Sequence, residues 1–124
     1  MALAIGTDIV EIKRIAQVVE RQGDKFIQRI LCESEHQEYE RLNQDIYYLA
    51  KRFAAKEAVA KALGTGIGRG VGFHDIMIVK NALGAPGVEL SGGALQAMMA
   101  LKGQQILLSL SDERHYALAY AMLT

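Results

Sequence analysis

The last strand of the chain constrains the fold most, because its pattern is apolar on both faces. Bulky side chains alternate there with small ones, at Tyr116, Leu118, Tyr120 and Met122 and at Ala117, Ala119 and Ala121. Successive side chains of a strand point to opposite faces, so one face is uniformly small and both faces need a cover. Few elements in a chain of 124 residues can cover a sheet twice. We therefore expect one of the covers to be another copy of the chain.

The remaining pattern predicts helices first and strands later, which is typical of an α+β fold. In the first half we expect an opening strand that ends near Gly6, a helix of about 11 residues that ends at Gly23, a helix capped by Asp24, and a short helix with Ser34 and Gln37 as a capping box. A long helix is expected over residues 46–63, between Asp45 and Gly64. In the second half we expect strands over 73–80 and 87–90, a helix over 93–102, and a hairpin of 105–111 and 114–123 that turns at Asp112 and Glu113. The length fits one domain over residues 1–124.

Composition excludes several classes of protein. The chain has no apolar run long enough to span a bilayer, and its first eight residues lack the basic leader of a secretory signal. Lys and Arg together number 14, as do Asp and Glu, so no global field attracts nucleic acid or an anionic membrane. The lone cysteine, Cys32, cannot close an intramolecular disulfide and fits a reducing compartment. We therefore expect a cytoplasmic protein that binds neither nucleic acid nor membranes.

Charge is nevertheless arranged in blocks. Residues 13–29 hold five basic and two acidic side chains, residues 30–45 are mainly acidic, and residues 51–61 are basic again. Arg14 and Arg21 are seven residues apart, so they share one face of the first helix. Such blocks are either solvated helix faces or binding surfaces for an anionic partner.

Five glycines between Gly64 and Gly72 predict a mobile loop. The loop lacks the Gly-Lys-Ser/Thr ending of a Walker motif. His36, His74 and His115 are too scattered for a zinc site, and Ser109 and Ser111 have no His-acid pair nearby for a hydrolase triad. We expect these histidines at the surface or in packing contacts, and Cys32 as a small packed side chain.

Glu57 is the most informative charged residue. On a helical projection it falls inside the apolar stripe of the long helix, which consists of Ile46, Leu49, Ala50, Phe53 and Ala60. A buried carboxylate is costly unless it is paired, hydrogen-bonded or bound to a metal. Glu57 is therefore either a functional residue or half of a structural ion pair with Lys61, one turn further along.

Asp8 supplies a second carboxylate, at the point where the opening strand is expected to give way to helix. An aspartate before a helix is commonly just an N-cap. Two carboxylates from separate elements are also a common minimum for holding Mg²⁺, which takes further oxygens from water and a phosphate substrate. The spacing alone leaves both interpretations open.

Two segments carry a resemblance to a known family. Residues 6–12, Gly-Thr-Asp-Ile-Val-Glu-Ile, and residues 52–64, Arg-Phe-Ala-Ala-Lys-Glu-Ala-Val-Ala-Lys-Ala-Leu-Gly, resemble the holo-[acyl-carrier-protein] synthases. These are the short, single-domain branch of the 4′-phosphopantetheinyl transferases. The resemblance extends over essentially the whole chain, including the Gly-x-Pro turn at Gly84–Pro86 and the closing hairpin.

The resemblance implies N-terminal helices packed on a mainly antiparallel sheet, and a homotrimer with active sites between subunits. It implies Mg²⁺-dependent transfer of phosphopantetheine from coenzyme A to a serine of an apo acyl carrier protein in fatty acid biosynthesis, with release of adenosine 3′,5′-bisphosphate. Asp8 and Glu57 match the metal-binding acids, and Lys61 matches a lysine that contacts the phosphates; these three are the expected catalytic residues. Coenzyme A is expected at Lys61, Gly64, Pro86 and Arg52, with Lys51 as an alternative contact for the 3′-phosphate.

The acyl carrier protein of such enzymes is acidic, so Arg14, Arg21 and Lys25 become the expected docking face. One position departs from the family. Many relatives have Ser-x-Ser-His before the last strand, whereas Ser109-Leu110-Ser111 is followed here by Asp112. His115 could replace the missing histidine only if the strand register placed it there, so it is not an expected site residue.

Two other functions are compatible with parts of this pattern. One is a non-catalytic oligomeric module whose basic helix binds an acidic partner. The other is a Mg²⁺-dependent hydrolase of nucleotide pyrophosphates, which would share the metal site and use water. Glu57 in the apolar stripe argues against the first, and turnover of coenzyme A without a carrier would favour the second.

Overall fold

The computed structural model describes residues 1–124. In chain order the elements are β1 (Ala4–Glu11), α1 (Ile12–Gln22), α2 (Asp24–Ile30), α3 (Glu33–Arg41), α4 (Ile46–Ala62), a 3₁₀ turn η1 (Phe73–Asp75), β2 (Ile76–Lys80), β3 (Pro86–Leu90), α5 (Gly92–Ala100), β4 (Ile106–Asp112) and β5 (Tyr116–Leu123). The expected α+β class is confirmed. None of the helices combines the length and the apolar character that crossing a membrane requires.

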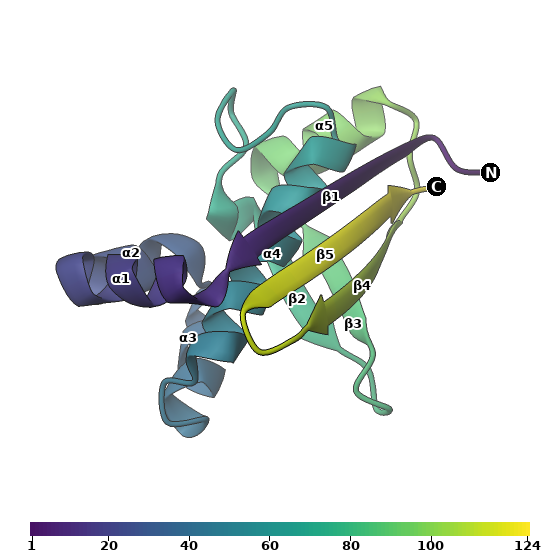
Figure 1. The fold of residues 1–124 in the computed structure, drawn as a ribbon. Coiled ribbons are helices and arrows are strands. Elements are labelled where there is room, and N and C mark those ends of the chain that lie inside the picture. Colours follow the sequence, from purple (N-terminus) through teal and green to yellow (C-terminus); the bar gives the residue numbers. More distant parts are fainter.

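The long helix α4 lies against one face of an antiparallel sheet with strand order β1-β5-β4 (Figure 1). Ala117, Ala119 and Ala121 of β5 are fully buried, and two of them belong to the same core cluster as Ala54 and Ala58 of α4. Small side chains on both elements let the helix approach the strand closely. The uniformly small face predicted for the last strand is therefore the face that α4 covers.

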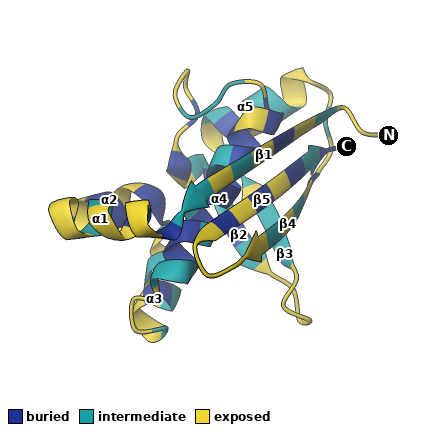
Figure 2. Cartoon of the chain, viewed as in Figure 1, coloured by how far each residue is buried: buried dark blue, intermediate teal, exposed yellow.

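The opposite face of this sheet has no cover within the chain. Burial alternates along β5 (Figure 2), and the outward residues are large apolar ones. Ile9 of β1, Leu107 of β4, and Tyr116, Leu118 and Tyr120 of β5 are all exposed. Single exposed apolar side chains are ordinary, but a contiguous set across three paired strands indicates an interaction surface.

A second core forms where α1, α2 and α3 pack around the first half of α4. Its buried members include Ile15 of α1, Ile27 and Ile30 of α2, Tyr39 of α3 and Leu49 of α4. The two-stranded antiparallel sheet of β2 and β3 packs beside α4, with Ile76 and Ile78 in the first core. α4 is consequently buried on several sides, which is why a single apolar stripe describes it poorly.

Several predicted boundaries are confirmed. α1 has 11 residues and ends at Gly23, and the Asp45 side chain accepts a hydrogen bond from Tyr47 N at 3.1 Å as the N-cap of α4. The turn of the closing hairpin differs by a residue: Asp112 is the last residue of β4, paired with Ala117, so the turn begins at Glu113.

Two predicted helix caps are wrong. Gly23, not Asp24, occupies the N-cap of α2, and Asp24 is the first helical residue. α3 is capped by Cys32, whose backbone N donates to the Glu35 carboxylate at 2.8 Å, so the pair of Ser34 and Gln37 does not form the box.

The glycine-rich segment after α4 is anchored at both ends. The backbone N of Gly66 donates to Ala60 O at 3.0 Å, and Val71 at the other end is buried. Gly93, at the start of α5, lies so close to Gly70 O that a Cβ at this position would overlap it. The segment therefore lies on α5 at a position where only glycine fits.

Candidate active site

Asp8 lies inside β1, not at the start of a helix. It pairs with Ala119 of β5, and β1 continues to Glu11, so the N-cap interpretation of Asp8 is wrong. The strand approaches α4 closely because Gly6, two residues earlier, has no side chain: a Cβ there would lie 2.6 Å from Ala62 N. This close packing brings Asp8 over the C-terminal half of α4.

Lys61 of α4 binds this strand. Its Nζ donates to Asp8 Oδ1 at 3.0 Å and to Thr7 O at 2.9 Å. The structural ion pair that the spacing allowed between Glu57 and Lys61 is not formed, because the lysine turns to β1 instead. Half of the Lys61 side chain remains exposed, so its ammonium group stays available to a ligand.

Glu57 is half-buried and lines a cavity of about 340 Å³ together with Asp8 and Arg14. No hydrogen bond or ion pair engages its carboxylate. Burial, followed by the nearby negative charge of Asp8, raises the pKa of Glu57, while Lys61 and Arg29 act in the opposite direction. Two neighbouring carboxylates of which one has no cation partner form an arrangement that favours binding of a cation.

The expected docking residues are all on the surface. Arg14 and Arg21 of α1 and Lys25 of α2 are exposed. Of the three, only Arg14 also lines the cavity of Asp8 and Glu57. Arg29 of α2, which sequence reasoning did not single out, is a further cation whose charge acts on Glu57.

A second cavity, of about 230 Å³, contains the other expected ligand contacts. Arg52 and Lys51 of α4 line it together with Lys80, Gly84 and Pro86 of the β2–β3 hairpin. Asp112 of β4 also lines it and pairs with Lys51 Nζ at 3.4 Å, whereas His115 lies outside it in the β4–β5 turn. The three cations make this cavity suitable for a phosphate group.

Gly64 lies outside both cavities, in the exposed turn after α4 with φ +80°. The predicted site residues therefore fall into two groups within one chain. Asp8, Glu57, Lys61 and Arg14 gather where β1 and α1 meet α4, and Arg52 and Pro86 gather between α4 and the β2–β3 hairpin.

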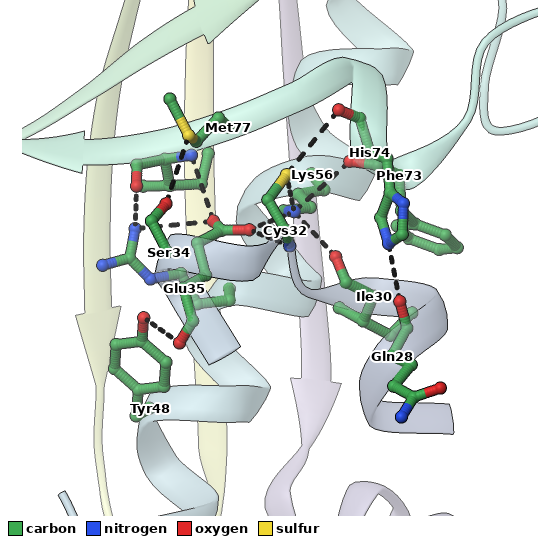
Figure 3. A network of polar contacts seen from close by, with 12 residues as sticks. Gln28, Ile30, Cys32, Ser34, Glu35, Tyr48, Lys56, Phe73, His74 and Met77 are labelled. Atoms are coloured by element: carbon green, nitrogen blue, oxygen red, sulfur yellow. Dashed lines mark hydrogen bonds and ion pairs between the residues drawn. The ribbon is translucent and has the colours of Figure 1, made fainter. Parts of the chain in front are cut away.

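Sequence reasoning missed a buried ionic cluster that contains Lys56, the residue before Glu57 in the sequence; Figure 3 shows the cluster. Lys56 and Glu35 are 0% and 2% exposed, and Lys56 Nζ donates to Glu35 Oε1 at 2.6 Å. Lys56 also donates to Ile30 O at 2.7 Å and Phe73 O at 3.3 Å. The helical projection placed the buried charge of α4 at Glu57, whereas the fully buried charge is its neighbour.

Cys32 and the histidines stay outside the two cavities. Cys32 is partly buried at the N-cap of α3, and burial above all raises the pKa of its thiol. His74 bonds Gln28 O at 2.6 Å through Nε2, and His36 lies 3.9 Å from Glu40. Nowhere do three or more His, Cys, Asp or Glu side chains form a metal-binding group.

Known proteins resemble the chain over its whole length. The model of the 4′-phosphopantetheinyl transferase superfamily matches residues 4–121. A holo-[acyl-carrier-protein] synthase from Shewanella amazonensis is 60% identical over 121 residues, which cover 98% of this chain and 97% of the relative.

Solved structures agree with this result. The crystal structure of holo-[acyl-carrier-protein] synthase from Neisseria meningitidis superposes with a TM-score of 0.92 at 42% identity, covering 100% of this chain and 99% of that one. The Helicobacter pylori synthase in complex with coenzyme A gives 0.86 at 36% identity and covers 97% and 99%. The chain therefore belongs to the holo-[acyl-carrier-protein] synthases of the 4′-phosphopantetheinyl transferase superfamily.

Proposed function

We propose that residues 1–124 act as one domain that transfers 4′-phosphopantetheine from coenzyme A to a serine of an apo acyl carrier protein, with Mg²⁺, in the cytoplasm and for fatty acid biosynthesis. The observation that carries the proposal is the pair of neighbouring carboxylates, Asp8 and Glu57, which line one cavity, with Lys61 bound to Asp8. Family membership supplies the substrates.

The donor set fits Mg²⁺. This ion commonly takes one or two protein carboxylates and fills its remaining positions with water and substrate phosphate oxygens. Asp8 and Glu57 would hold it. Burial first, and then the negative charge of Asp8, raise the pKa of Glu57, and a bound cation would offset the repulsion between the two carboxylates. When bound, the ion would neutralise charge on the pyrophosphate oxygens of coenzyme A.

The remaining chemistry falls to the chain's own residues. The serine oxygen of the carrier attacks the phosphorus that bears pantetheine, a new O–P bond forms, and the pyrophosphate P–O bond breaks to release adenosine 3′,5′-bisphosphate. Lys61, held by Thr7 O and Asp8, offsets negative charge on the phosphates. Glu57 accepts the serine proton, directly or through water.

We propose a homotrimer with each active site between two subunits. The exposed apolar face of β1, β5 and β4 supports this arrangement, because it needs a cover that the chain does not supply. The separation of the two cavities supports it as well. The carboxylates of one subunit would meet the Arg52 and Pro86 cavity of its neighbour, which would hold the 3′-phosphate and adenosine of coenzyme A. Gly64, exposed beyond α4, would approach the same ligand.

The acidic carrier protein would bind across α1 and α2. Arg14, Arg21 and Lys25 are exposed there, and Arg14 extends this surface to the cavity of Glu57. A carrier serine bound beside Arg14 would therefore lie near the proposed base.

The test is intact-mass spectrometry of an apo acyl carrier protein incubated with the enzyme, coenzyme A and Mg²⁺. We expect a gain of one phosphopantetheinyl group that EDTA abolishes and that Glu57→Gln reduces at least 100-fold, as expected for loss of a ligand and base. Glu40→Gln, an exposed change on α3, serves as the matched control.

Two results would overturn the proposal. Absence of a mass gain with several carriers, from a folded oligomer, would favour a binding module. Release of adenosine 3′,5′-bisphosphate in the absence of any carrier would favour a pyrophosphate hydrolase.

A further inference from the structure

The buried cluster of Glu35, Lys56 and Arg52 is the strongest feature that the proposed chemistry leaves unused. All three residues are at most 6% exposed, and they come from α3 and α4. Burying charges is costly even when they are paired, so such a cluster needs a reason beyond stability. Its contacts lead to the β2–β3 hairpin.

Glu35 uses both of its oxygens. Oε1 accepts from Lys56 Nζ at 2.6 Å and from Cys32 N at 2.8 Å, which fixes the carboxylate between α3 and α4. Oε2 accepts from Ile78 N at 3.1 Å and lies 3.9 Å from Arg52 Nη1. The Glu35 carboxylate therefore links α3 and α4 to the middle of β2.

Arg52 binds the same residue of β2, Ile78. Its Nη1 donates to Ile78 O at 2.7 Å, and its guanidinium lies over the Tyr48 ring at 4.7 Å. Both backbone groups of Ile78 are thus bound by side chains, the N–H by Glu35 and the carbonyl by Arg52. Tyr48 in turn donates its hydroxyl to Glu35 O at 3.2 Å.

Ile78 is the central residue of β2, whose only strand partner is β3. A two-stranded hairpin is marginally stable by itself, so its position depends on what holds it. This hairpin supplies Lys80, Gly84 and Pro86 to the cationic cavity, and Arg52 lines the same cavity. Glu35 thus holds the hairpin directly and orients the guanidinium that faces it.

We propose that Glu35 is a positioning residue for nucleotide binding: it holds Arg52 and the β2–β3 hairpin at the spacing that the adenosine 3′,5′-bisphosphate part of coenzyme A requires. Glu35 does not line this cavity itself. The inference rests on the proposed function, which sites the nucleotide there.

The test uses Glu35→Gln, which keeps the side-chain shape but removes the charge between two buried cations and one of the two acceptor oxygens. Adenosine 3′,5′-bisphosphate is the probe in calorimetric titrations, and KM is measured separately for coenzyme A and for the carrier protein. We expect the Kd of the bisphosphate and the KM of coenzyme A to rise about tenfold, as for one lost charge-assisted contact, with the carrier KM within about twofold of wild type.

Two control variants distinguish a loss of positioning from a general loss of stability. Glu40→Gln removes an exposed carboxylate from the same helix, and Ile27→Val trims a buried side chain of α2 in a core cluster that does not include Ile78. Both should bind the bisphosphate as wild type does, even where Ile27→Val lowers the melting temperature. If Glu35→Gln does not fold, the double variant Glu35→Leu/Lys56→Met replaces the ion pair by apolar groups of similar size and carries the same expectation.

The outcomes are distinguishable. If the wild-type protein binds the bisphosphate and Glu35→Gln binds it equally well, this inference alone is overturned. The inference is also overturned if Glu35→Gln and Ile27→Val both raise the KM of coenzyme A and the KM of the carrier protein equally, because such a result would report a loss of stability. Failure of the wild-type protein to bind the bisphosphate would overturn the proposed function and this inference together.

Discussion

Gly6 of β1 packs directly on the backbone of α4 beside Ala58 and Ala62. Asp8 follows two residues later on the same strand and meets Lys61 at 3.0 Å. The distance between strand and helix, which is set by an absent side chain, thus determines how the carboxylate of one element meets the ammonium group of the other. A methyl group at position 6 would push the strand away.

Gly6→Ala should therefore destabilise the protein and impair transfer. Overpacking costs about 1–3 kcal/mol, which corresponds to a fall in melting temperature of roughly 4–12 °C in a chain of this size. Thermal denaturation followed by circular dichroism checks this. The control is Gly72→Ala, since nothing lies within 4 Å of a Cβ at Gly72 and its φ is not positive. A Gly6→Ala melting temperature equal to that of wild type would contradict the packing argument.

Asp112→Asn should tighten nucleotide binding. Asp112 holds Lys51 at 3.4 Å and places a negative charge in a cavity that is otherwise cationic. Removing this charge, whose side chain is 34% exposed, frees Lys51 and should lower the Kd of adenosine 3′,5′-bisphosphate about threefold, with a smaller effect at high salt. Titration calorimetry at two salt concentrations measures this, with Glu113→Gln of the adjacent turn as control. Weaker binding by Asp112→Asn would mean that the carboxylate supports the ligand.

The Cys32 thiol should react slowly with alkylating reagents. Burial, assisted by Glu35 and opposed by Lys56, raises the pKa of this thiol, so the folded protein keeps the proton at a pH where an ordinary cysteine has lost it. The rate with iodoacetamide should lie below that of the unfolded chain and rise as the pH increases. Glu35→Gln should accelerate the reaction, because Glu35 raises this pKa. Equal rates in folded and denatured protein would show that the thiol is not shielded.

The same pKa shift affects stability. In the pH interval between the ordinary pKa and the raised one, the folded state binds more protons than the unfolded state does. The free energy of unfolding should therefore fall as the pH rises through this interval. Cys32→Ala should remove that part of the slope, which denaturant titrations at several pH values can measure.

Arg14→Glu should raise the KM for the carrier protein about tenfold and leave that for coenzyme A nearly unchanged, with strong salt dependence of the wild-type value. The reason is the position of Arg14, exposed on α1 and also beside Asp8 and Glu57. Lys13→Glu makes the same charge reversal one residue earlier, outside this cavity. Steady-state kinetics with both substrates measures these values. If Arg14→Glu raised the KM for the carrier protein and the KM for coenzyme A together, the proposed docking face would be contradicted.

Local rules predicted much of the fold. The limits of α1, the Asp45 cap and the closing hairpin follow from glycines, capping residues and periodicity close together in the chain. The length of β1 was missed because Thr7, Asp8 and Glu11 interrupt its apolar pattern. Those polar residues are tolerated because Thr7 donates its hydroxyl to Ala119 O and Asp8 binds Lys61, both contacts with distant segments.

The site was predictable only in part. Motif resemblance indicated Asp8, Glu57 and Lys61, but no periodicity could have paired Lys56 with a glutamate 21 residues away. One signal was available, because Glu35 stands three residues after the Cys32 cap, the spacing of a capping box. Cysteine is not among the usual capping residues, so the sequence pattern favours a capping box at Ser34 instead.

The side-chain contacts with the backbone of Ile78 also affect whether a strand of another molecule can pair with β2. The free edge of a two-stranded sheet is a template on which a strand of another molecule can add. Glu35 and Arg52 already bind the N–H and the carbonyl at the centre of the β2 edge. An incoming strand would have to displace a buried carboxylate and a buried guanidinium at once. The β2 edge of the hairpin that lines the cationic cavity is thereby protected from edge-to-edge pairing, even though β3 is the only strand that pairs with β2.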